Sequence, residues 1–129
     1  MRDAKIRLKE SWDDMTLDEL IQMFVQKNDD EFVEWRTEDG IEFWTSKVNE
    51  EAGEIAGVIN KNYRFKKGYM GKKVTDTNFR VAMETEIADV LICLVFLAES
   101  CGIDIKEALK DCLVKNFERF GWIALESNI

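Results

Sequence analysis

Apolar residues recur at every third or fourth position along most of the chain, which is the spacing of one face of an α-helix. The first such stretch follows Thr16, which together with Glu19 has the spacing of a capping box, and the polar run at 28–30 is expected to end it. A short helical piece is expected at 31–36, ahead of a break at Gly40. Longer helices are predicted at residues 41–61, 77–100 and 104–120.

Strong breaks between these helices are few. Gly102 and Gly121 follow two of the predicted helices, as C-terminal glycines do, and residues 62–76 form the least helical stretch. The chain contains no proline, which argues against a turn-rich β-sandwich or barrel. We therefore predict an all-α fold built on four helices, a single domain over residues 1–129, with residues 1–15 as a loosely attached arm.

Composition limits the kind of protein. The chain has 129 residues, of which 46% are hydrophobic, enough for one domain with a sizeable core. Its 18 basic and 26 acidic residues give a net charge of −8, which disfavours a nucleic-acid polymer as partner because phosphate contacts need basic surface. The most apolar run, residues 90–98, is too short to span a membrane, and no secretory signal is expected. Three cysteines without a CxxC spacing favour a reducing, cytoplasmic location.

Histidine is absent from the chain. Its absence excludes Ser-His-Asp and Cys-His catalytic arrangements, as well as zinc sites built on histidine. Any bound metal must therefore be held mainly by oxygen, which suits Mg²⁺ or, as a substitute, Mn²⁺.

The helix predicted at 41–61 carries three glutamates that are spaced within about one helical turn. They are Glu50, Glu51 and Glu54, and Glu51 is the one beside the apolar face of the helix. Such a triplet taken alone is more often a solvated face than a binding site. Its meaning depends on what the next helix brings to it.

A second acidic pair, Glu86 and Asp89, is set into the helix predicted at 77–100. This helix is apolar almost all round, which predicts that it is buried. Helices joined by one loop usually pack antiparallel, so the acidic pair is expected to meet the glutamate triplet. Ionised carboxylates that converge in an apolar setting need a compensating charge, and a divalent cation would supply it.

The ordered set of motifs resembles the MazG-like superfamily of nucleoside triphosphate pyrophosphohydrolases. This all-α group includes dimeric dUTPases and phosphoribosyl-ATP pyrophosphohydrolases. The resemblance covers about residues 43–121. The motifs are KVNEEAGEI at 47–55, EIADVL at 86–91, GIDIKEAL at 102–109, and Lys115-Asn116 followed by Arg119.

The resemblance implies a MazG-like four-helix bundle and Mg²⁺-dependent hydrolysis of a (deoxy)nucleoside triphosphate to the monophosphate and pyrophosphate. Such a reaction cleans the nucleotide pool. The implied metal ligands are Glu51, Glu54, Glu86 and Asp89. Glu50 or Glu51 is implied to orient or deprotonate the attacking water.

Substrate-binding positions are also implied by the resemblance. They are Lys47 in the first motif, and Lys115, Asn116 and Arg119 in the last. Lys115 and Arg119 have an alternative role, which is to complement the dipole at the end of their helix. Asn116 falls on an apolar stripe, where its amide needs a partner that either a nucleotide or a backbone carbonyl can supply.

Two further substrate contacts are suggested by residue type. Trp44 lies on the same side of its helix as Glu51 and is a candidate for stacking on a base, with core packing as the favoured alternative. Lys66 and Lys67 belong to the basic stretch 61–73, which is expected either to close over the triphosphate as a lid or to balance an acidic surface.

Two alternatives to a general nucleotide pyrophosphohydrolase stay open at this point. One is a dedicated enzyme, either a dUTPase or dCTPase or a phosphoribosyl-ATP pyrophosphohydrolase, and the other is a non-catalytic helical interaction module. Self-association is expected in each case, as a homodimer or a dimer of dimers, because four helices leave part of the apolar helix at 77–100 uncovered. The alternative is that residues 1–40 fold back over this helix.

Overall fold

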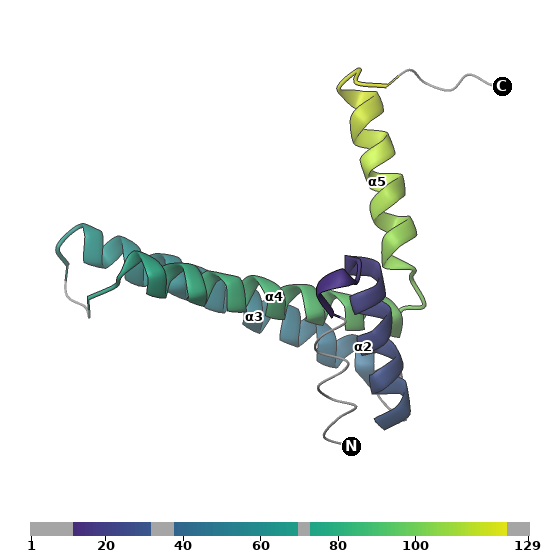
Figure 1. Cartoon of the computed structure of the whole chain (residues 1–129), viewed down its shortest axis with the longest axis horizontal. Coiled ribbons are helices and arrows are strands. Elements are labelled where there is room, and N and C mark those ends of the chain that lie inside the picture. The colour runs from purple at the N-terminus through teal and green to yellow at the C-terminus, as the bar shows by residue number, and fades with distance from the viewer. Residues whose placement is uncertain (1–11, 32–37, 70–72, 124–129) are drawn as a thin grey trace. The chain divides into compact units, whose positions relative to one another are not determined.

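The structure, a computed structural model, describes residues 12–31, 38–69 and 73–123, and most of these residues are helical, with short turns between the helices. No strand occurs in these ranges, so the predicted all-α class is confirmed. The elements are a short 3₁₀ helix η1 (Trp12–Asp14) and four α-helices, α2 (Leu17–Glu31), α3 (Glu38–Lys66), α4 (Asp76–Ser100) and α5 (Ile105–Arg119) (Figure 1).

The helices divide between two compact units. The unit Arg36–Cys101 contains α3 and α4, and the unit made of Met1–Trp35 and Gly102–Ile129 contains α2 and α5. The single domain expected over residues 1–129 stays a prediction.

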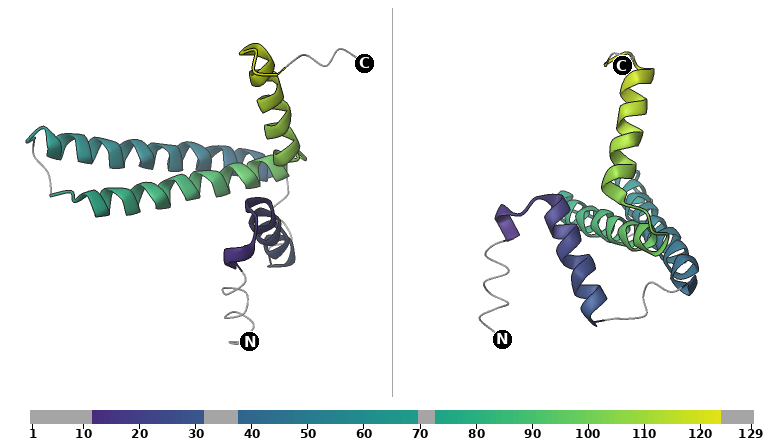
Figure 2. Two further views of the ribbon diagram at one scale, coloured as in Figure 1. Left: turned by 45° about the horizontal axis from the view of Figure 1, so that its top comes forward. Right: turned by 90° about the vertical axis from the view of Figure 1, so that its right-hand side faces the viewer.

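Helices α3 and α4 form a long antiparallel hairpin, and they lie side by side over most of their length (Figure 2). Phe96 on α4 is only 4% exposed, and the indole of Trp44 on α3 packs against its ring with the centroids 4.5 Å apart. Cys93, one turn before, is also buried. The antiparallel pairing therefore places the two acidic motifs of the sequence on neighbouring helices.

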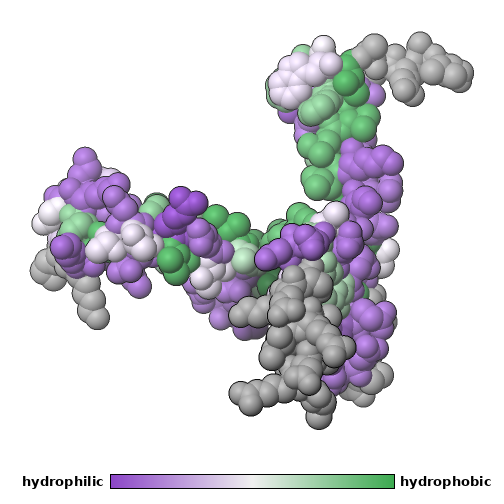
Figure 3. All heavy atoms as spheres, viewed as in Figure 1, coloured by the Kyte–Doolittle hydropathy of each residue, from purple (hydrophilic) through white to green (hydrophobic). Residues whose placement is uncertain are grey.

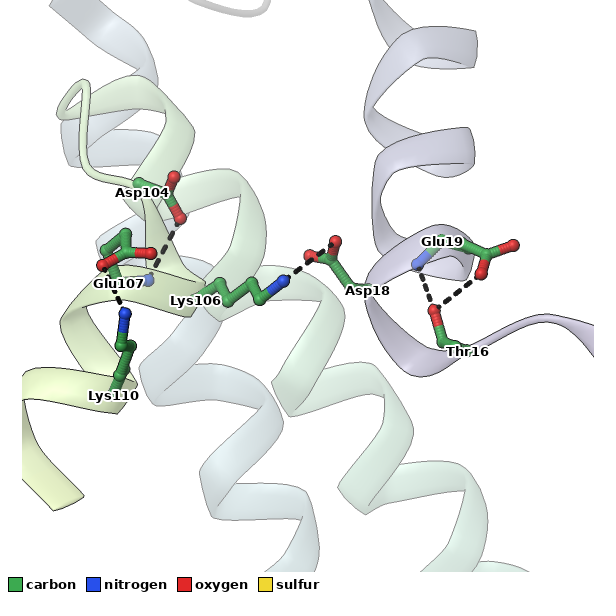
Figure 4. Close-up of polar contacts among 7 residues, drawn as sticks. All are labelled: Thr16, Asp18, Glu19, Asp104, Lys106, Glu107 and Lys110. Atoms are coloured by element: carbon green, nitrogen blue, oxygen red, sulfur yellow. Dashed lines mark hydrogen bonds and ion pairs between the residues drawn. The ribbon is translucent and has the colours of Figure 1, made fainter.

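The helix starts follow the capping chemistry read from the sequence (Figure 4). The Thr16 hydroxyl oxygen accepts a hydrogen bond from the Glu19 backbone N–H at 3.1 Å and donates to the Glu19 carboxylate. Asp104 is the N-cap of α5 and accepts from the Glu107 backbone N–H at 3.2 Å. Each cap satisfies a backbone donor that has no partner within the helix.

Two predicted breaks near the start of the chain are wrong. Helix α2 continues through 28–30 to Glu31, because side chains four residues apart bridge the polar run, with Lys27 Nζ lying 2.8 Å from Glu31 Oε1. Gly40 lies inside α3 and is buried, so it does not break the chain there. The short helical piece predicted at 31–36 lies outside the described residues, apart from Glu31.

The predicted loop at 62–76 is also partly wrong, because α3 continues to Lys66. Gly68 lies two residues beyond this end, and its positive φ of 74° permits the Tyr69 backbone N–H to donate to the Arg64 carbonyl at 2.8 Å. The same arrangement follows α5, where Gly121 has a φ of 72° and the Trp122 N–H donates to the Phe117 carbonyl at 2.9 Å, which confirms that glycine as a helix terminator.

Helix α4 is not fully buried within one chain, and part of its apolar surface is uncovered, as expected for a chain of four helices. Several of its large apolar side chains are exposed, between 37% and 56%, and these are Val81, Ile87, Leu91, Ile92 and Leu94. The space-filling view shows apolar side chains at the surface of the hairpin and along α5 (Figure 3). Among the described helices, none is long and apolar enough to cross a membrane.

Candidate active site

Five carboxylates from α3 and α4 gather on the hairpin, and we call them the acidic cluster. They form two groups that share Glu51, and within each group one oxygen per residue lies within 4.8 Å of the others. The groups are Glu50, Glu51 and Glu54 from α3, and Glu51, Glu86 and Asp89 from both helices. The structure thus brings the triplet and the acidic pair together, as the antiparallel pairing predicts.

Burial differs across the acidic cluster. Glu51, Glu86 and Asp89 are half-buried between the helices, whereas Glu50 and Glu54 are exposed. One oxygen of Glu51 and one of Glu86 (Oε2 in both) are buried with no hydrogen-bond partner among the described residues. A buried carboxylate oxygen without a donor is destabilising, so both oxygens are suited to a cation or a proton.

The crowding raises the pKa of two of these carboxyls. The pKa of Glu86 rises from 4.5 to about 6, chiefly because its carboxyl shares a hydrogen bond with that of Glu54, and further because of burial and neighbouring charges. The pKa of Glu51 also rises, mainly through burial and then through hydrogen bonding to Glu54. The metal-free cluster therefore favours retaining a proton, which a cation would displace.

Lys47 and Cys93 border the acidic cluster. Lys47 Nζ lies 3.4 Å from Glu50 Oε2, one turn further along α3. Cys93 follows Asp89 by one turn of α4, and burial, with the nearby charges of Glu51 and Asp89, raises the pKa of its thiol. Cys93 is uncharged, but it follows Asp89 by four residues on the same helix, and this spacing in the sequence is enough to place its side chain next to the cluster.

Trp44 contributes to the hairpin core, as the alternative to base stacking predicts. Its indole is half-buried, contacts Phe96, and meets the Phe43 ring edge-on at a centroid distance of 4.9 Å. A role for Trp44 in nucleotide binding stays a prediction.

The C-terminal candidates lie on α5, which belongs to the other unit. Lys115 and Arg119 are exposed, and the Arg119 guanidinium stacks over the Phe120 ring at 4.8 Å. Asn116 is half-buried, and its amide nitrogen contacts Cys112 Sγ at 3.7 Å, a weak acceptor. Their expected roles at the phosphates and sugar stay predictions.

The two lysines of the expected lid lie at the end of α3. Lys66 is the last residue of the helix, and Lys67 Nζ lies 5.8 Å from the centre of the Tyr63 ring. Lys66 follows Glu51 by 15 positions on one continuous helix, which separates their backbones by about 22 Å along the axis at 1.5 Å per residue. In this structure both lysines thus lie far along the helix axis from the acidic cluster of their own chain, and their expected role at the triphosphate stays a prediction.

Comparison with known proteins agrees with the motifs of the hairpin. A protein of Bacillus subtilis (strain 168), named "Uncharacterized protein YpjD", is 41% identical over 63 residues, which are 49% of this chain and 51% of YpjD. The chain thus spans about half the length of that relative. The family model of the MazG nucleotide pyrophosphohydrolase domain matches residues 40–123, a range that contains the whole acidic cluster. Because this match covers more than half of the chain, the protein belongs to the MazG nucleotide pyrophosphohydrolase domain family.

Proposed function

We propose that this protein hydrolyses a (deoxy)nucleoside triphosphate to the nucleoside monophosphate and pyrophosphate in a Mg²⁺-dependent reaction, with Mn²⁺ as a substitute. The proposed role is to clear or regulate a nucleotide pool, in the cytoplasm. Family membership supports the reaction class, and the acidic cluster supports the need for a divalent cation.

The observation that carries this proposal is the pair of unpartnered buried oxygens on Glu51 and Glu86, set among other carboxylates. All donors of the cluster are carboxylate oxygens, which Mg²⁺ and Mn²⁺ prefer over softer ligands. The residues present therefore fit a hard divalent cation. We assign its coordination to Glu51, Glu54, Glu86 and Asp89.

A bound Mg²⁺ neutralises charge on the triphosphate and polarises its phosphorus. The chain itself must place the water and accept its proton. Glu50 and Glu51 are the candidates, and the Lys47 ammonium 3.4 Å from Glu50 restrains that carboxylate. The water oxygen bonds to the α-phosphorus, the bond from that phosphorus to the bridging oxygen breaks, and the water proton passes to the carboxylate as pyrophosphate leaves.

Substrate contacts complete the proposal. Lys115, Asn116 and Arg119 are assigned to the phosphate and sugar side, and Trp44 is retained as a candidate near the base. The protein is proposed to act as a homodimer or a dimer of dimers, because Leu91 and Leu94 on α4 are more than a third exposed in one chain. Burial of such surface against a second copy is favourable.

A panel of nucleoside triphosphates, assayed by pyrophosphate release with and without Mg²⁺, tests the reaction. Glu54→Gln and Asp89→Asn are each expected to lower turnover by about 100-fold or more, because each removes a ligand charge. Glu84→Gln is the matched control, because Glu84 is an exposed carboxylate of α4 paired with Arg80 outside the cluster. All three variants should keep the helical circular dichroism of the parent.

Three results would contradict the proposal. The first is a lack of pyrophosphate release from every nucleotide of the panel, which would favour the non-catalytic module. The second is hydrolysis that does not depend on a divalent cation. The third is parental activity in Glu54→Gln and Asp89→Asn, which would remove the ligand assignment while leaving the reaction in place.

A further inference from the structure

The end of the hairpin at which α3 leads into α4 carries a charge opposite to that of the chain as a whole. No acidic residue occurs at 55–75. We call the charged part of this stretch that the structure describes, residues 61–69 and Lys73, the basic tip. It holds five exposed cations, which are Lys61, Arg64, Lys66, Lys67 and Lys73. The net charge of −8, which disfavours a nucleic acid as partner of the average surface, therefore conceals a local positive surface.

Three cations of the basic tip form a row. Lys61, Arg64 and Lys67 recur at every third residue, and the Lys67 N–H donates to the Tyr63 carbonyl at 3.0 Å, so the helical turn extends to Lys67. Their backbones span about 9 Å along the axis at 1.5 Å per residue. In the described part of the chain, no carboxylate forms an ion pair with any of the three. The helix dipole acts within the last turn and does not account for Lys61. The row fits a polymer whose anions recur along its length.

Exposed aromatic rings lie among these cations. Tyr63 is 54% exposed and Tyr69 is 61% exposed, and their ring centroids lie 6.5 Å apart. Tyr69 is held there by the turn at Gly68, through the bond from its N–H to the Arg64 carbonyl. Surfaces that bind single-stranded nucleic acid combine cations for the phosphates with rings on which bases stack. The basic tip presents both.

The aromatic side chains also favour a nucleic acid over an anionic membrane. Helices that bind a membrane surface bury a wholly apolar face of leucine, phenylalanine or tryptophan. The two most exposed rings of the basic tip belong to tyrosines, which carry a hydroxyl, and Phe65 is less exposed than either, at 36%. The space-filling view shows this end of the hairpin as mainly hydrophilic (Figure 3).

The acidic cluster is too distant to repel a polyanion strongly from this row. Glu54, its nearest carboxylate along α3, lies about 10 Å from Lys61 and about 20 Å from Lys67 along the axis at 1.5 Å per residue. At physiological ionic strength, exposed charges more than about 8 Å apart are largely screened from each other. The basic tip therefore acts as an electrostatic surface of its own.

We propose that the basic tip binds single-stranded nucleic acid, with Lys61, Arg64 and Lys67 on successive phosphates and Tyr69 stacked on a base. The site is separate from the acidic cluster, so this inference goes beyond the proposed hydrolysis and does not depend on it. A duplex should bind more weakly, because its bases are stacked on each other and are not available to the tyrosines.

Fluorescence anisotropy of labelled 12-nucleotide oligothymidylate and oligouridylate tests the proposal on the full chain. EDTA is present throughout, so that binding through a cation at the acidic cluster does not contribute. We expect a Kd of about 10 µM at 100 mM salt for at least one of the two probes. The logarithm of the affinity should fall with the logarithm of the salt concentration with a slope of about −2, as three phosphate contacts to a single strand predict.

Charge variants test the row of cations. Lys61→Gln with Arg64→Gln should weaken binding by about tenfold or more and reduce the salt slope by more than half, because two of the three contacts are lost. Lys106→Gln with Lys110→Gln removes the same charge from exposed positions of α5 and should bind as the parent does. Lys66 and Lys67 are left unchanged, because both have an expected role at the triphosphate.

Ring variants test the stacking. Tyr69→Ser should weaken binding by about tenfold, whereas Tyr69→Phe should bind nearly as the parent does, because the ring that stacks on the base is retained. All variants should keep the helical circular dichroism of the parent, since the changed side chains are exposed.

Four results would overturn the inference. The first is the absence of saturable binding of both oligonucleotides, including the case in which vesicles of phosphatidylserine and phosphatidylcholine bind instead. The second is parental affinity in Lys61→Gln with Arg64→Gln. The third is parental affinity in Tyr69→Ser, which would remove the stacked base. The fourth is a 12-base-pair duplex that binds as tightly as the single strands, which would reduce the basic tip to a general attraction for polyanions.

Discussion

The carboxyl of Glu86 offers the most direct test of the acidic cluster before any substrate is bound. Its pKa of about 6, against an ordinary value of 4.5, means that the folded protein holds a proton that the unfolded chain releases. Midway between these values, folding takes up about 0.7 of a proton at this group, because the folded form is mostly protonated and the unfolded form mostly ionised. The stabilisation from this proton is fully present below pH 4.5 and is lost as the pH rises through about 6.

The experiment is a carboxyl-carbon NMR titration of the metal-free protein, with Glu86→Gln used to assign the resonance. The Glu86 resonance is expected to titrate with a midpoint near 6. Glu54→Gln should move this midpoint toward 4.5, because the hydrogen bond with the Glu54 carboxyl and its charge are prominent causes of the shift. Glu84→Gln, on the exposed side of the same helix, should leave it unchanged.

Addition of Mg²⁺ extends the test. A bound cation favours the ionised carboxylate, so saturating Mg²⁺ should lower the Glu86 midpoint. For the same reason the rise in melting temperature caused by Mg²⁺ should be larger at pH 7.5 than at pH 5. A metal-free midpoint near 4.5, or a midpoint that Mg²⁺ leaves in place, would refute the reasoning that Glu86 lies in a crowded, cation-binding cluster.

Two stability predictions follow from the hairpin core and from a helix cap. Phe96→Ala should cost about 3–5 kcal/mol in urea unfolding, because the ring is 4% exposed and packs on Trp44, and a loss below about 1 kcal/mol would contradict that packing. Asp104→Ala should cost about 1 kcal/mol by removing the acceptor for the Glu107 N–H, whereas Asp104→Asn should cost little because asparagine caps equally well. Equal losses in the two Asp104 variants would show that the cap is not the cause.

Local chemistry explains what could be read from the sequence. Thr16 and Asp104 cap helices through bonds to backbone groups three residues away, and Gly121 ends a helix through its own positive φ. These are interactions within one turn, so residue type and spacing suffice to predict them. The misplaced breaks at 28–30 and Gly40 have the same origin, because residues with weak helix propensity stay helical when neighbouring turns support them.

The candidate site was only partly predictable for a different reason. The spacing of Glu50, Glu51 and Glu54, and of Glu86 and Asp89, follows from helix periodicity alone. Which carboxyl of one helix contacts which carboxyl of the other depends on how far the two helices slide past each other, and that register is set by side-chain packing. The shared hydrogen bond between Glu54 and Glu86, and the high pKa of Glu86 that results, therefore belong to the tertiary structure.

The sequence by itself determined the helical class, the caps and the acidic motifs, because each depends on residues within about one turn of each other. Only the tertiary structure decided that Trp44 packs on Phe96, that large apolar side chains of α4 stay exposed, and that Lys66 lies a helix length away from Glu51. Which side chains pack together, which stay exposed and which distant residues can contact each other all depend on how the helices pair and where each helix ends. A hydrophobic pattern limits these properties, but many pairings satisfy the same pattern, and close packing between side chains selects one.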